Sequence, residues 1–164
     1  MTLLFSSAII LDMSNTIQIH NKDISITPSL ELFINLSRTL SVTTRKFDHM
    51  GSMVGFTDFM ILYYLSRAED KKMRRIDLAD KVGLTASGVT RLLLPMEKIG
   101  LVGRDTNPRD ARVSYVTLTS GGERVLRETI ERAEIIADSI IPSKDIEKIS
   151  MFIRLSNDIH QLAR

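Results

Sequence analysis

The segment from residue 74 to residue 122 constrains the fold of this 164-residue chain more than any other part. It holds two helical patterns separated by Gly83, and Thr85, a residue type that caps helix N-termini, precedes the second pattern. Two runs rich in β-branched residues follow, and the turn residues Asn107 and Pro108 lie between them. This order of elements predicts two short helices joined by a tight turn and followed by a β-hairpin.

The boundaries of these elements follow from the caps and the apolar spacing. We expect helices over residues 76–82 and 86–99, and strands over residues 101–104 and 113–118. Pro95 lies inside the second helix, where proline costs about 3 kcal/mol because it removes a backbone hydrogen bond. Two outcomes stay open: a helix kinked at Pro95, and a helix that stops near Leu94 and is followed by another short one.

Helical patterns also precede this segment. Apolar residues at helical spacing predict a first helix that begins at Pro28 or Ser29. We expect Thr57 to cap a second helix, which is apolar on nearly all sides and should therefore be buried on most of them. Residues 71–73 are expected to form only a short connection to the next helix.

A long helix is expected after the hairpin, beginning at Thr119 or Ser120, and Ser120 with Glu123 fits a capping box. A last helix follows Pro142. The first helix and the last two carry apolar stripes that a central head cannot cover, so we expect a second copy to bury them. The expected fold is mainly α with a small β wing: an N-terminal arm over residues 1–28, a helical dimerisation region over residues 29–55 and 121–164, and a winged helix-turn-helix head over residues 56–120.

Positive charge is concentrated in the same central segment. The chain has a formal net charge of +2, but residues 71–112 hold ten Lys and Arg against five Asp and Glu, a local net charge of +5. A basic segment of this kind is the footprint expected for phosphate binding. A solvated basic face with no ligand is the alternative interpretation.

The helix after Thr85 has the front edge expected of a helix that reads duplex DNA. Its small residues allow close approach, Thr90 can donate, accept or touch a thymine methyl, and Arg91 can bind a guanine edge or a phosphate. In the hairpin, Arg109 at the tip suits a narrow minor groove, and Asp110 is expected to position the arginines beside it. The candidate DNA-binding residues are Thr85, Ala86, Ser87, Gly88, Thr90, Arg91, Arg75, Arg104, Arg109, Asp110 and Arg112.

These residues resemble the MarR (multiple antibiotic resistance regulator) family of winged helix-turn-helix proteins. The motifs that carry the resemblance are IDLADKVGLTASGVTRLL, MEKIGLV and RDTNPRDARVSYVTLTSGG. The resemblance covers residues 30–160 in element order, but only residues 76–122 in specific letters. It implies an obligate dimer, a wing that inserts arginine into the minor groove and, in many members, an effector pocket between the head and the dimerisation region.

By motif position, the resemblance assigns six residues to the DNA interface: Ser87, Thr90 and Arg91 in the reading helix, and Arg109, Asp110 and Arg112 in the wing. Two residues depart from the family pattern, Pro95 inside the reading helix and Ala111 at a position where a charged residue is common. The chain has no cysteine, which excludes the oxidation-sensing branch of the family.

The function indicated is a sequence-specific transcription regulator that binds a palindromic site in double-stranded DNA as a dimer, acts as a repressor and is released by a small aromatic effector. The effector would favour a spacing of the two heads that no longer fits successive major grooves. The candidate pocket residues are Met50, Met53, Phe56 and Tyr63, for each of which a plain core position is the favoured alternative. A winged-helix module that binds an acidic protein partner is the alternative class.

No sequence motif favours an enzyme, because the three histidines lack metal-ligand spacing and there is no nucleophile motif or phosphate-binding glycine loop. We expect no cofactor and no bound metal. The apolar N-terminal run reaches Asp12 before it is long enough to span a membrane, and Met13 is an alternative start. The expected partners are duplex DNA and a second copy of the chain, with no membrane, and the expected location is the cytoplasm.

Overall fold

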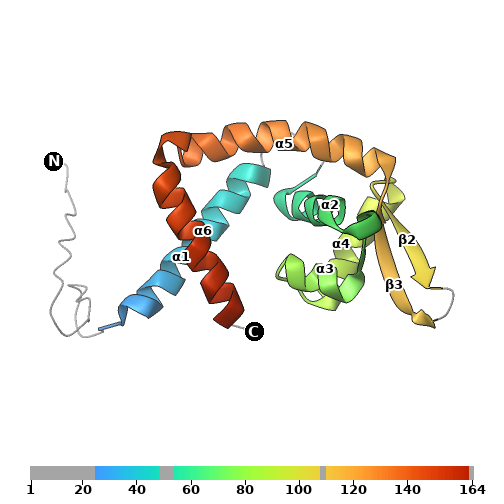
Figure 1. Cartoon of the computed structure of the whole chain (residues 1–164), viewed down its shortest axis with the longest axis horizontal. Helices are drawn as coiled ribbons and strands as arrows, with labels where there is room; N and C mark the ends of the chain where they lie inside the picture. The colour runs from blue at the N-terminus through green and yellow to red at the C-terminus, as the bar shows by residue number, and fades with distance from the viewer. Residues whose placement is uncertain (1–24, 49–53, 108–109, 163–164) are drawn as a thin grey trace, which may run out of the picture. The chain divides into compact units, whose positions relative to one another are not determined.

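A computed structural model of the chain describes residues 25–48, 54–107 and 110–162, without the side chains of residues 106–107, 110–113 and 143 (Figure 1). The residues fall into two compact units, Met1–Arg45 and Lys46–Arg164. The elements in chain order are α1 (Pro28–Asp48), α2 (Phe56–Arg67), the 3-10 turn η1 (Glu69–Lys71), β1 (Lys72–Arg74), α3 (Arg75–Lys81), α4 (Ala86–Lys98), β2 (Val102–Asn107), β3 (Asp110–Leu118), α5 (Ser120–Ile140), the 3-10 turn η2 (Ser143–Asp145) and α6 (Ile146–Leu162). This order confirms the expected fold class, mainly α with a small β wing.

The helices at the two ends of the chain expose apolar side chains. Helix α1 begins with a hydrogen bond from the Leu30 N–H to the Thr27 hydroxyl at 3.3 Å. Its exposed large apolar residues are Leu30, Phe33, Ile34, Leu40 and Val42. In α6 the corresponding set is Ile146, Met151, Phe152, Ile153, Leu155 and Leu162. The predicted stripes are exposed only in part, because Phe47 at the end of α1 is buried.

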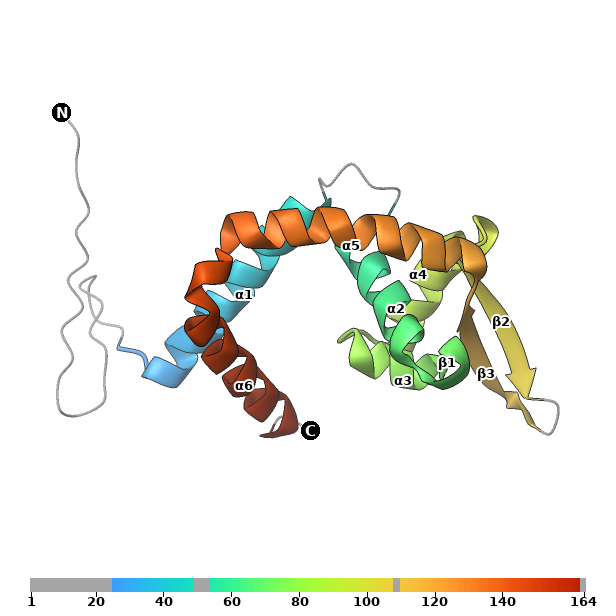
Figure 2. The same cartoon turned by 45° about the horizontal axis from the view of Figure 1, so that its top comes forward.

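The core of the larger unit lies among α2, α3, α4 and the sheet. Helix α2 supplies its centre, since Ile61, Leu62 and Leu65 are fully buried. The prediction that this helix is buried on most sides is confirmed, although Tyr63 is 42 % exposed. Helices α2, α3 and α4 pack together in both views (Figure 1 and Figure 2), and Val116 of β3 closes the core from the sheet side.

The start of α2 differs from the prediction that Thr57 caps it. The helix begins at Phe56 with Gly55 as the cap residue, and Thr57 lies inside the first turn. Two carboxylates take over the capping role: Asp48 accepts the Phe56 N–H at 2.8 Å, and Asp58 accepts the Gly55 N–H at 3.3 Å. A carboxylate is a stronger acceptor than a hydroxyl at the positive end of a helix, which explains why the threonine loses this role.

Helix α4 runs without interruption from Ala86 to Lys98, with Pro95 inside it. The structure therefore excludes the alternative of two shorter helices. Pro95 is exposed, so water can hydrate the carbonyl group of Arg91 that loses its usual backbone donor. The predicted end of this helix, residue 99, and the bounds of α3 agree with the structure to within one residue.

The sheet has three antiparallel strands in the order β1-β3-β2. Strand β1 was predicted as a mere connection, because three residues with two cations among them carry no readable alternation. The hairpin strands are longer than predicted, and their ladder has an irregularity between Thr106 and Asn107. Figure 1 shows the β2–β3 hairpin projecting from the larger unit.

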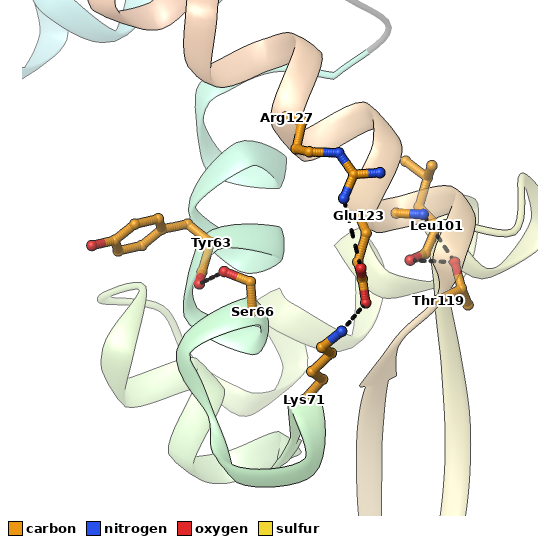
Figure 3. Close-up of polar contacts among 8 residues, drawn as sticks. Tyr63, Ser66, Lys71, Leu101, Thr119, Glu123 and Arg127 are labelled. Carbon is orange, nitrogen blue, oxygen red and sulfur yellow. Dashed lines mark hydrogen bonds and ion pairs between the residues drawn. The ribbon is translucent and has the colours of Figure 1, made fainter.

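Helix α5 begins after Thr119, which settles the choice between the two predicted starts. The Thr119 hydroxyl accepts the Gly122 N–H at 3.0 Å and lies 2.6 Å from the carbonyl oxygen of Gly100. It also lies 3.0 Å from the carbonyl oxygen of Leu101 (Figure 3). The predicted capping box of Ser120 and Glu123 does not form. The carboxylate of Glu123 binds Lys71 instead, with Arg127 beside it.

Among the residues that the structure describes, none of the helices combines the length and the apolar character needed to cross a membrane.

Candidate nucleic-acid interface

Helix α4 separates a buried face from an exposed front edge. Its core side consists of Val89, Leu93 and Met96, each nearly without exposed surface. On the opposite side, Ser87 and Arg91 are exposed one helical turn apart. An amphipathic helix of this kind is held by its rear face, and its front edge is free to enter a groove.

The first turn of α4 is fixed by its cap. The Thr85 hydroxyl accepts the Gly88 N–H at 3.0 Å and lies 3.1 Å from the Ser87 hydroxyl. A Cβ atom at Gly88 would lie 3.1 Å from the Thr85 hydroxyl oxygen, so the glycine keeps this turn tight. The hydroxyl of Thr90 donates to the Ala86 carbonyl at 2.8 Å, which leaves its lone pairs and methyl group for a ligand.

Two of the predicted DNA-binding arginines have partners inside the protein. The Arg104 Nε donates to Glu97 at 2.7 Å, and this hydrogen bond raises the pKa of Arg104. The Arg75 Nη2 donates to the Ser114 hydroxyl at 3.1 Å. Sequence reasoning missed both partners: Ser114 is 39 residues from Arg75, and Glu97 lies on a different element from Arg104, seven residues earlier.

The wing tip carries the remaining candidates. Arg109 lies outside the described residues, as do the side chains of Asp110 and Arg112, whose backbones belong to β3. The predicted pairing of Asp110 with an arginine is therefore neither supported nor contradicted. The backbone places Asp110 and Arg112 on the hairpin that follows α4.

Two of the candidate effector residues, Phe56 and Tyr63, belong to α2. Met50 and Met53 fall outside the described residues. Phe56 and Tyr63 belong to one row of rings along α2: the centroids are 4.6 Å apart for Phe47 and Phe56, 6.0 Å for Phe56 and Phe59, and 6.3 Å for Phe59 and Tyr63. Sequence reasoning missed Phe59, although its spacing of three and four residues from Phe56 and Tyr63 places all three on one helix face.

Burial raises the pKa of Asp58, in the first turn of α2. The hydrogen bond from the Gly55 N–H lowers the pKa in part, and the nearby charge of Asp48 raises it further. The carboxylate caps α2 and at the same time loses hydration, so its charged form is less stable here than in water.

Two helices joined by a tight turn and followed by a β-hairpin that pairs with β1 define a winged helix-turn-helix protein. Residues 56–114 match the MarR family. The HTH-type transcriptional repressor YetL of Bacillus subtilis (strain 168) is 24 % identical over 135 residues, which cover 81 % of this chain and 81 % of that protein.

Two solved structures from Streptomyces coelicolor show the same fold. Sco3205, a MarR family transcriptional regulator in complex with DNA, is 18 % identical with a TM-score of 0.69, over 84 % of this chain and 92 % of that one. The PcaV transcriptional regulator, in complex with its natural ligand, is 17 % identical with a TM-score of 0.73, over 87 % of this chain and all of that one. The winged helix-turn-helix segment of this chain is therefore similar to the MarR family, and the chain shares the fold of these two regulators.

Proposed function

We propose that this protein is a dimeric repressor that reads a palindromic site in duplex DNA with helix α4. The observation that carries the proposal is the Thr85-capped helix with Ser87 and Arg91 exposed on its front edge and a rear face buried in the core. Similarity to YetL, which is named a repressor, supports the sign of regulation, and similarity to Sco3205 in complex with DNA supports the ligand.

The residues of α4 and the wing have separate tasks in this proposal. Arg91 binds a guanine edge or a phosphate in the major groove, and Ser87 and Thr90 approach the neighbouring base edges. Arg109 enters the adjacent minor groove, and Arg112 binds the sugar-phosphate backbone. Thr85, Ala86 and Gly88 bring the helix end close to the DNA.

A dimer follows from the apolar side chains that α1 and α6 leave exposed. Large exposed apolar surface marks an interface in a folded protein. A two-fold axis through these helices would place two copies of α4 roughly 34–36 Å apart, which is one helical turn of DNA. We propose the cytoplasm as its location, because a DNA-binding regulator must share a compartment with its DNA.

A small aromatic effector is the proposed signal for release. PcaV was solved with its natural ligand, and in this chain the half-buried Phe56 and the partly exposed Tyr63 belong to a row of neighbouring rings. A planar ligand stacking on this row would act by favouring one arrangement of the heads over another.

The proposal is tested by selection of duplexes from a random pool with the purified protein at a stated salt concentration. We expect an inverted repeat to emerge, bound by two copies of the chain. Failure to enrich any sequence would overturn the proposal and favour a head that binds an acidic protein. Addition of simple aromatic acids to the selected complex then tests release.

Replacement of Arg91 by alanine tests the reading role of α4. We expect a loss of about 1–3 kcal/mol on the selected duplex and a relaxed preference at one base pair. The measurement is a titration of selected and random duplexes side by side. Equal losses on both would contradict a base contact, whereas Arg112→Ala should weaken both alike.

A further inference from the structure

The basic segment 71–75 contacts partners in the hairpin and at the start of α5. Lys71 binds Glu123 of α5 (Figure 3). The Lys72 Nζ lies 3.7 Å from a carboxylate oxygen of Asp105 in β2 and 5.7 Å from the ring centroid of Tyr115 in β3. These contacts connect the segment to α5, β2 and β3. Much of its positive charge is therefore paired within the protein rather than available to a phosphate.

Arg75 makes the contact nearest to the wing tip. Its Nη2 donates to the Ser114 hydroxyl at 3.1 Å, and its Nε is buried with no acceptor among the residues that the structure describes. A buried N–H group without an acceptor costs free energy of folding. The Arg75 guanidinium is turned toward the protein interior in spite of this cost. A phosphate could reach this Nε only if the side chain moved.

Ser114 is the first residue of β3 toward the wing tip that has no partner in β1. Strand β1 pairs with β3 from Lys72 opposite Thr117 to Arg74 opposite Tyr115, and beyond Tyr115 only β2 accompanies β3. The irregularity of the hairpin begins next to Thr106, the partner of Ser114. Two-stranded ribbons twist more than wider sheets and are only marginally stable alone. Strand β1 supports β3 as far as Tyr115, and the hydrogen bond from Arg75 to Ser114 extends this support by one residue.

We propose that Arg75 is a positioning residue that sets the angle of the wing through Ser114. The proposal rests on the DNA-binding function proposed above. From Ser114 to Asp110 the strand extends by about 13 Å at 3.3–3.4 Å per residue. A tilt of about 10° at Ser114 would therefore move the end of the strand by about 2 Å. Such a shift exceeds the tolerance of a hydrogen bond in the minor groove.

The test compares Ser114→Ala, Arg75→Met and the double variant on the duplex selected by the wild-type protein. We expect each single variant to weaken binding about two- to tenfold, the factor that corresponds to one net hydrogen bond. The double variant should bind no more weakly than the worse single variant, because both changes break one contact. Wild-type affinity of Ser114→Ala would overturn the proposal, since a direct phosphate contact by Arg75 needs no serine.

Salt dependence separates positioning from phosphate contact. We expect Ser114→Ala and Arg75→Met to keep the wild-type slope of log affinity against log salt concentration. A slope reduced by about 0.9 in Arg75→Met would reveal a direct phosphate contact and overturn the proposal. Arg67→Met, an exposed arginine at the end of α2, is the matched control for the loss of one positive charge.

Amide hydrogen exchange without DNA gives an independent readout. In both single variants, residues 104–107 and 110–113 should exchange faster than in the wild type, while the exchange of α5 should stay unchanged. Unchanged exchange in the hairpin would overturn the positioning role. If the wild-type protein selects no duplex, the proposed function fails, and the exchange data still decide whether Arg75 holds the wing.

Discussion

Replacing Gly122 by alanine is expected to disrupt the joint between the start of α5 and the exit from α4. A Cβ atom at this position would overlap the carbonyl oxygen of Leu101 and lie 2.8 Å from the Leu118 Cδ1 and 3.1 Å from the Leu101 carbonyl carbon. The backbone must therefore move. The Leu101 carbonyl accepts from the Thr119 N–H at 3.3 Å and lies 3.0 Å from the Thr119 hydroxyl, and both interactions weaken when it is displaced.

The expected loss follows from these contacts. Overpacking costs about 1–3 kcal/mol, and two weakened hydrogen bonds cost about 1 kcal/mol each. Alanine has a better helix propensity than glycine, and this offsets at most about 1 kcal/mol of the loss in the free energy of unfolding. The net loss in the free energy of unfolding is about 2–4 kcal/mol, which lowers Tm by about 4–16 °C for a chain of this length.

The assay is urea denaturation followed by circular dichroism at one fixed protein concentration, because a dimer is stabilised by mass action. Gly121→Ala is the matched control: it makes the same chemical change one residue earlier, and its Cβ would lie 3.1 Å from the Gly100 carbonyl oxygen, without overlap. If Gly122→Ala proves as stable as Gly121→Ala, the close approach of α5 to Leu101 is wrong.

Three further predictions concern caps and charges. Thr85→Ala should lower the free energy of unfolding by about 1 kcal/mol in the same urea assay, because the Gly88 N–H loses its acceptor; an unchanged midpoint would contradict the cap. Asp58→Asn should gain stability relative to the wild type as the pH rises above 3.8, the ordinary pKa of the carboxyl, since the folded state holds the proton of Asp58 to higher pH than the unfolded chain does; a difference in urea midpoint that is constant from pH 4 to about 7 would refute the raised pKa. Lys71→Met should raise the pKa of Glu123 towards its ordinary value of 4.5, measured by NMR titration, because the hydrogen bond from Lys71 lowers it; an unshifted titration would show that the pair does not form.

The sequence predicted the head well because its signals are local. A capping threonine before α4, the glycine after α3 and the apolar spacing of both helices act within a few residues, so their positions were predicted to within one residue. The resemblance in letters also lies in this segment, which is where the family match falls.

The failures involve partners that are distant in sequence or short elements. Thr57 was predicted to cap α2, but Asp48, eight residues before Phe56, provides the acceptor. Strand β1 exists only because β3 pairs with it, and three residues carry no pattern of their own. The hydrogen bond of Arg75 to Ser114, 39 residues away, was not predicted. All of the DNA-contact candidates, Arg75 included, stay predictions.

The close contact between Gly122 and Leu101 limits the positions at which this chain can be joined to segments of its relatives. A chimera that keeps the DNA-reading head but takes its terminal helices from a relative should not be cut at Thr119, because the first turn of α5 and the loop at Gly100 and Leu101 fit only as a pair. The better crossover lies beyond Ala133, the last buried residue of α5. Grafts made there would exchange the outer part of α5 and all of α6, and would leave the head and its contact with the start of α5 unchanged.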